Sequence, residues 1–351
     1  MKKLLFAALA FAAVACSKSE VIEQTKPLAI SFENPFVENT TKSVYNPSTT
    51  LSDLKAFTVY GFMDEPAGVV FNQEPVTLTS DGWKSQTTQY WALNHDYYFA
   101  ALAGKNWSVN TTDATTYGVG TVTFTNENGT DDLLYAATHS TTKGIDKITT
   151  EDPGAVEFIF NHLLSKVKFA FTNTFTNPNT SIVVSNVTLS VPATGTLNLG
   201  EDKWWEGDKW DAADNHDLVL KFGDIVTDAA DENGDKVYPA AYYTENGQTV
   251  PAAESYKELL TIPTDYRIYT ITFTAELLQG GVSAGKYNHV ATVEGIRFEM
   301  GHAYKFTAEL NGENINPDEA LIPITFSVTS VKEWENDVYD GGQIETVPAN
   351  N

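Results

Sequence analysis

The sequence predicts an all-β protein. Apolar and polar residues alternate with a period of two along many segments, turn-forming residues separate these segments, and aromatic residues make up 12% of the chain. Threonine is also abundant, and threonine and aromatic side chains suit a pleated surface that is half buried. Helix-forming runs are nearly absent after the first sixteen residues.

Alternation is clearest over residues 269–277, where apolar residues at odd positions alternate with threonine or glutamate at even positions. Polar turns rich in asparagine, aspartate and glycine, such as residues 80–82 and 126–129, separate the segments. Short strands joined by such turns favour β-sandwiches. Helical turns are expected only at 161–165 and 254–260. The same alternation predicts further strands over 57–62, 76–78, 97–101, 122–124, 167–171, 187–191, 304–310 and 322–328.

The first sixteen residues resemble a bacterial export signal with a lipidation site. Lys2 and Lys3 precede an apolar run over 4–14, and Cys16 follows that run. The run is shorter than the roughly 20 residues that a membrane crossing needs. We therefore expect a signal peptide over 1–16, a lipidated Cys16, and a mature protein tethered to the outer membrane at the cell surface.

Length and composition limit the remaining possibilities. A chain of 351 residues suggests two domains. A polar stretch near 144–154 predicts the boundary between domains over 46–152 and 153–351, and a leading stretch over 17–45 precedes the first of them. The 46 acidic residues against 22 basic ones argue against nucleic-acid binding, because phosphate neutralisation needs a basic surface.

The chain shows no convincing catalytic, metal or cofactor site. The motif Gly281-Val282-Ser283-Ala284-Gly285 matches a serine hydrolase pattern, but it lacks the strand before it and the helix after it that such a serine needs. We expect a glycine-rich hairpin there, with an esterase using Ser283 as an alternative. The six histidines show no metal-ligand spacing.

Three tryptophans lie in an acidic stretch, at Trp204, Trp205 and Trp210. If they are exposed they could stack on sugar rings, which would make the protein a surface glycan-binding lipoprotein. They could equally anchor a long hairpin to the domain.

Four segments carry recognisable motifs. In the segment over 158–167 an apolar strand leads to His162, a small residue, Lys166 and an apolar position. The others are LKAFTVYGF over 54–62, GHAYKFTAEL over 301–310 and IPITFSVTSVKEW over 322–334. Together these segments resemble the fimbrillin family of Bacteroidales. From the residues themselves, we expect His162 to satisfy backbone groups and Lys166 to be solvated.

The resemblance implies two transthyretin-like β-sandwich domains in tandem. It also implies a stalk, anchor or tip subunit of type V pili, or a related surface lipoprotein, that acts in adhesion. In that family a trypsin-like protease removes the N-terminal strand, and the vacated groove accepts a strand from a neighbouring subunit. The implied partners are other fimbrial subunits, the outer membrane through the lipid, and surface ligands of host or bacterial cells.

The chain has parts that suit this assembly. Apolar residues alternate over 28–32, as a removable strand requires, and Lys42 offers a cleavage site in a polar linker. Related proteins often carry arginine there, and the first arginine of this chain is Arg267. Lys55 is a weaker candidate because it abuts a strand.

A donor strand must present apolar side chains at alternate positions to a sheet edge. The candidates are Ile322, Ile324, Phe326 and Val328. The segment could instead be a core strand of its own domain, in which case the protein would be a tip or anchor subunit and not an ordinary stalk subunit.

Overall fold

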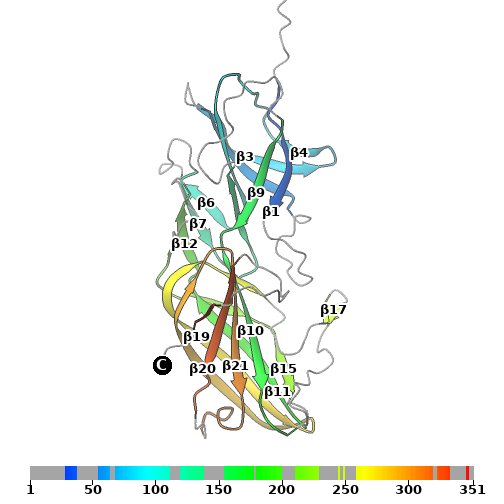
Figure 1. The fold of residues 1–351 in the computed structure, drawn as a ribbon, viewed down its shortest axis with the longest axis vertical. Coiled ribbons are helices and arrows are strands. Elements are labelled where there is room, and N and C mark those ends of the chain that lie inside the picture. Colours follow the sequence, from blue (N-terminus) through cyan, green and yellow to red (C-terminus); the bar gives the residue numbers. More distant parts are fainter. Residues whose placement is uncertain are drawn as a thin grey trace, which may run out of the picture.

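A computed structural model describes residues 28–37, 54–63, 68–110, 119–137, 154–177, 179–199, 210–228, 244–245, 248–249, 258–318, 322–332 and 345–347. The described residues contain strands and turns and no helix, so the prediction of an all-β protein is confirmed. Within these ranges no helix has the length and apolarity that a membrane crossing requires. The molecule is elongated, with one group of strands at each end of its long axis (Figure 1).

The upper group in Figure 1 is built on a seven-stranded sheet. A four-stranded sheet lies beside it. The seven strands in spatial order are β1 (Phe32–Val37), β9 (Val156–His162), β8 (Leu133–Ala137), β5 (Tyr97–Gly104), β2 (Ala56–Met63), β3 (Gly68–Thr79) and β4 (Gly82–Ser85). The four are β13 (Trp210–Ala212), β12 (Thr194–Asn198), β7 (Thr121–Thr125) and β6 (Trp107–Asn110).

The lower group is a sandwich of two further sheets around one core. The first has the order β18 (Leu259–Thr261), β10 (Ser165–Asn173), β21 (His302–Leu310), β22 (Phe326–Lys332) and β23 (Glu345–Val347). The second has the order β14 (Leu218–Lys221), β11 (Thr180–Val191), β19 (Thr264–Gln279) and β20 (Val282–Phe298), and β15 (Ile225–Asp228) also pairs with β11. A separate hairpin joins β16 (Thr244–Glu245) and β17 (Gln248–Thr249).

The two central strands β5 and β8 of the seven-stranded sheet are buried on both faces. In β5, Phe99 and Ala101 face one core cluster, whereas Ala100 and Leu102 face another. The second cluster also takes in Leu197 of the four-stranded sheet. Burial on both faces explains why β5 and β8 read as continuous apolar runs and not as alternating strands.

The predicted division between residues 152 and 153 stays a prediction, but the sheets cross that position. β9 follows it and joins the seven-stranded sheet, and β12 pairs with β7. The helical turn expected at 161–165 is wrong, since β9 ends at His162 and β10 begins at Ser165. The two residues between them are fully buried leucines, which carry the chain from one group of sheets to the other.

The turn predicted at 126–129 is present and also links the two groups. The amide of Gly129 donates to Oδ1 of Asn126 at 2.8 Å, and the Asn126 side-chain amide donates to the carbonyl oxygen of Leu260 at 2.8 Å. Gly129 has a φ of 79°, and a Cβ there would lie 2.7 Å from Cδ2 of Leu220. Only glycine fits this close approach at a left-handed position.

Four buried tyrosines predict a loss of stability in alkali. Burial raises the pKa of Tyr269 to about 12, partly offset by the Thr264 hydroxyl and by Arg267, and burial also raises the pKa of Tyr60, Tyr135 and Tyr304. The unfolded chain therefore releases these protons first, at its ordinary pKa of about 10. Stability should be complete below about pH 10 and fall as the pH rises toward about 12.

Urea unfolding at increasing pH, followed by tryptophan fluorescence, would measure this loss. The matched variant is Tyr269→Phe, which removes one titrating group. It should lose less stability than the wild type over the same pH interval, and an equal loss would contradict a contribution from Tyr269.

Candidate functional site

The chain enters the upper group through residues 28–37, which we call the N-terminal segment. Its first half is held by backbone hydrogen bonds to an irregular stretch before β5. The amide of Ile30 donates to the carbonyl oxygen of Gln89 at 2.8 Å, and the amide of Trp91 donates to that of Leu28 at 3.0 Å. The segment is thus aligned before β1 begins.

The second half of the N-terminal segment is β1, which pairs in parallel with β9. The register runs from Phe32 opposite Val156 to Val37 opposite Phe160, with an irregularity between Glu33 and Phe36. β1 is the edge of the seven-stranded sheet, with β9 as its one neighbour among the described strands. Detaching β1 therefore breaks a single ladder.

Two apolar side chains fix the N-terminal segment to the core. Ile30 is 4% exposed and Phe32 is 2% exposed, whereas Leu28 is exposed. Burying two such side chains contributes about 3–6 kcal/mol of transfer free energy. The ring centroid of Phe32 lies 6.0 Å from Phe57, 5.6 Å from Phe71, 6.4 Å from Phe99 and 6.0 Å from Phe158.

This geometry makes the N-terminal segment a separable part of the core. Its buried side chains Ile30 and Phe32 fill the interior, but the backbone of β1 lies at a sheet edge, and the other described strands all follow it in the chain. Loss of the segment would expose the aromatic rings around Phe32 and the backbone edge of β9. An extended strand with apolar residues at alternate positions could cover both.

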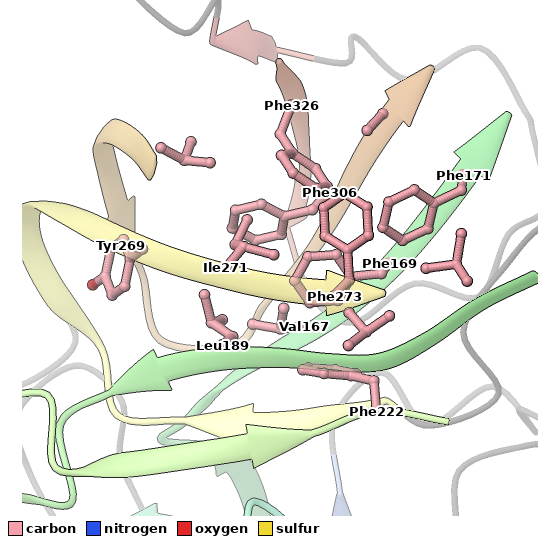
Figure 2. Packing of buried hydrophobic residues seen from close by; sticks show 14 of the residues in the cluster. Val167, Phe169, Phe171, Leu189, Phe222, Tyr269, Ile271, Phe273, Phe306 and Phe326 are labelled. Atoms are coloured by element: carbon pink, nitrogen blue, oxygen red, sulfur yellow. The ribbon is translucent and has the colours of Figure 1, made fainter. Parts of the chain in front are cut away.

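The predicted donor strand lies in the core of the lower group (Figure 2). Phe326 is 2% exposed and Val328 is 3% exposed, and β22 pairs with β21 on one side and β23 on the other. Ile324 packs against the same core, whereas Ile322 is 42% exposed, and both precede the strand. The Phe326 ring lies 6.0 Å from Phe169, 5.7 Å from Phe171 and 6.1 Å from Phe273.

One tryptophan of the candidate sugar platform is buried. Trp210 is 8% exposed, and its indole N–H donates to the carbonyl oxygen of Leu163 at 3.0 Å. A ring with both faces packed cannot stack on a sugar, so Trp210 serves to anchor β13. Trp204 and Trp205 lie outside the described residues, as do Cys16 and Lys42.

The two polar residues singled out near the middle of the chain are both paired. Nδ1 of His162 lies 2.7 Å from Oδ2 of Asp132, so the imidazole contacts a carboxylate, whereas a backbone group was expected. The expectation that Lys166 is solvated is wrong. Lys166 is 5% exposed, and its ammonium lies 3.0 Å from the carboxylate of Glu258, because β10 runs through the interior between β18 and β21.

Ser283 lies in a hairpin and not on a nucleophile elbow. Gly280 and Gly281 have φ values of 57° and 80° and form the two-residue turn between β19 and β20. Ser283 is exposed at the start of a long strand, β20, which continues to Phe298 where a nucleophile elbow would have a helix. Across the described ranges, no group of three or more histidine, cysteine, aspartate or glutamate side chains is arranged to hold a metal ion.

Comparison with known protein families identifies the chain. The family model described as fimbrillin-like matches residues 41–329. The chain belongs to the fimbrillin-like family. This family supports a fimbrial, non-enzymatic role at the cell surface.

A solved fimbrial protein has a similar fold. A fimbrial protein from Bacteroides vulgatus is 14% identical, has a TM-score of 0.55, and is matched over 86% of this chain and 98% of its own. The fimbrial anchor protein Mfa2 from Porphyromonas gingivalis is 13% identical over 87% of this chain and 97% of its own, with a TM-score of 0.34. A search of curated protein sequences finds no match.

Sequence reasoning about this fimbrillin-like chain missed the partners of the N-terminal segment. Residues 89–91 and β9 bind it, and neither carries a local signal for that role. Strand β1 also extends further than the alternation over 28–32 indicates, to Val37. The apolar residues of 156–160 are the one sequence feature that could have suggested a buried strand next to it.

Proposed function

We propose that this chain is a fimbrial subunit that reaches the cell surface as a lipoprotein acylated at Cys16. A protease cleaves it at Lys42, and it joins other fimbrial subunits by strand exchange and acts in adhesion. Membership of the fimbrillin-like family supports the fimbrial role. The observation that carries the strand-exchange step is the N-terminal segment, an edge strand whose Phe32 is buried among four phenylalanines.

Strand exchange follows from the energetics of this segment. Once the linker is cut, the segment is held by its own contacts alone and can leave. An incoming strand with large apolar side chains regains the transfer free energy of Ile30 and Phe32, about 1.5–3 kcal/mol for each side chain. It also restores the ladder along β9.

The position in the fibre depends on where the donor strand comes from. Phe326 and Val328 pack in the core of their own chain, and releasing them costs their burial and the ladders on both sides of β22. This observation favours a second candidate, a tip or anchor subunit that accepts a strand and donates none.

Limited trypsin treatment of the purified precursor tests both candidates. The matched variants are Lys42→Gln and Lys55→Gln, and the new N-terminus is sequenced in each case. We expect cleavage after Lys42 that only Lys42→Gln abolishes. Laddered oligomers after cleavage indicate a stalk subunit, and a trimmed chain that forms no ladder but binds an added strand peptide indicates a tip or anchor subunit. A trimmed chain that neither oligomerises nor binds such a peptide would refute strand exchange.

A further inference from the structure

The longest of the described strands lies at a sheet edge. β20 has 17 residues and ends the order β14-β11-β19-β20, so β19 is its one neighbour among the strands that the structure describes. Figure 1 shows it in the lower group, away from the N-terminal segment. An edge strand presents a row of unpaired N–H and C=O groups that another strand can use.

The centre of β20 is regular and alternates strictly in burial. Lys286 to Val293 pairs with Glu276 to Tyr269 without a bulge, and the register shifts fall outside this stretch. His289 and Val293 face the core, whereas Val290 between them is 74% exposed. The outward-facing residues are, in order, Lys286, Asn288, Val290, Thr292 and Glu294, all exposed.

The usual protection of an edge strand is weak here. Natural edges carry prolines, bulges or several charges that prevent pairing. The stretch from Lys286 to Glu294 has no proline and carries one positive and one negative charge, at its two ends. Its centre is Val290, an exposed β-branched residue that favours a strand pair.

The exposed residues of β20 can pair with those of a second copy. When two copies of β20 run antiparallel and are centred on Val290, a residue that precedes Val290 faces the residue that follows Val290 by the same number of positions in the partner. Lys286 then faces the partner's Glu294, Asn288 faces the partner's Thr292, and Val290 faces itself. Facing residues are separated by an even number of positions in the sequence. Where the N–H and C=O groups of one residue point away from β19, those of the residue that faces it therefore do so too, and the two can form hydrogen bonds.

The exposed side chains of β20 have charges and N–H groups that a second copy could bind. Glu294 forms no ion pair with any described residue, whereas Nζ of Lys286 lies 3.6 Å from Oε2 of Glu276 and its side chain is 60% exposed. The Thr274 hydroxyl donates to Oδ1 of Asn288 at 2.9 Å, which orients that amide and leaves its N–H groups for an outside acceptor. We propose that β20 is an interaction surface for a second copy of this chain, forming a two-fold dimer by antiparallel β20 pairing centred on Val290.

Cysteine cross-linking tests the register directly. In the full chain carrying Cys16→Ser, Val290→Cys places the only thiol on the two-fold axis, where the two Cα atoms would be about 4.5–5.5 Å apart. That separation permits a disulfide. The matched control is Val219→Cys, an exposed valine on the strand β14 of the same sheet. We expect a cross-linked dimer with Val290→Cys that forms much faster than with Val219→Cys, and equal rates would overturn the proposal.

Charge exchange tests the pairing without a covalent bond. Glu294→Lys and Lys286→Glu each place like charges opposite one another in a homodimer, so each variant alone should lose dimer in sedimentation velocity. Mixing the two restores opposite charges at both ends, and a heterodimer should form. The control Glu309→Lys changes an exposed residue of β21 and should dimerise as the wild type does. A monomeric wild type, or a mixture that stays monomeric, would refute the β20 dimer and leave strand exchange at the N-terminal segment unaffected.

Discussion

Replacing Phe32 by alanine should lower the free energy of unfolding of the intact chain by about 3–5 kcal/mol. The ring is 2% exposed and touches four other phenylalanines, so its loss leaves a cavity that rigid neighbours cannot fill. Chemical denaturation followed by tryptophan fluorescence would measure the change.

Two comparisons make this result specific to the N-terminal segment. Leu28→Ala changes an exposed residue of the same segment and should shift stability by less than about 0.5 kcal/mol. After trypsin removes the segment, the wild type and Phe32→Ala become the same molecule, so their stabilities should converge. A loss of less than about 1 kcal/mol in the intact chain would mean that Phe32 does not support the core.

Replacing Phe326 by alanine should also cost about 3–5 kcal/mol, for the same physical reason in the other core. Its ring packs against Phe169, Phe171 and Phe273 (Figure 2). In contrast to the effect of Phe32→Ala, this loss should persist after trypsin treatment, because β22 stays with the trimmed chain. Denaturation before and after cleavage separates the two cases.

The control for Phe326 is Ile322→Ala, because Ile322 is 42% exposed and precedes β22. It should change stability by less than about 0.5 kcal/mol. If Phe326→Ala leaves stability unchanged but abolishes oligomer ladders, the segment is a donor strand and does not support its own core. If it destabilises the monomer and leaves ladders intact, the donor lies elsewhere.

Strands with one buried and one solvent-exposed face were predictable from the sequence. Alternation over 269–277 and 304–310 matches the buried odd positions of β19 and all of the buried even positions of β21. These strands have one face toward the core and one toward water, so the two-residue period appears directly in the sequence. The turn at 80–82 was equally predictable from its residues, and Gly82 there has a φ of 94°, which favours glycine.

Features that depend on distant parts of the chain were not predictable in this way. Parallel pairing of β1 with β9 joins residues more than a hundred positions apart, and nothing local encodes it. The same holds for the ion pair of Lys166, because its partner Glu258 lies far along the chain, directly before β18. The helical turn expected at 161–165 failed because apolar residues between two strands look like a short helix when their burial is unknown.

The candidate site was predictable in part. The alternation over 28–32 indicated a strand with apolar anchors, and Ile30 and Phe32 are indeed buried. Its attachment to residues 89–91 and to β9 could not be read from the sequence, because backbone hydrogen bonds place no demand on side-chain identity. Lys42 and Cys16 were recognised by their neighbours in the sequence, and both stay predictions.

The burial of β5 and β8 on both faces limits how this protein can diversify. β5 and β8 touch a core on each side, so they offer almost no position where a polar residue would be tolerated. Tolerated substitutions must therefore gather on strands such as β3, where most side chains meet water. The exterior that other cells and molecules encounter can change from one lineage to the next while the interior that holds the N-terminal segment is retained.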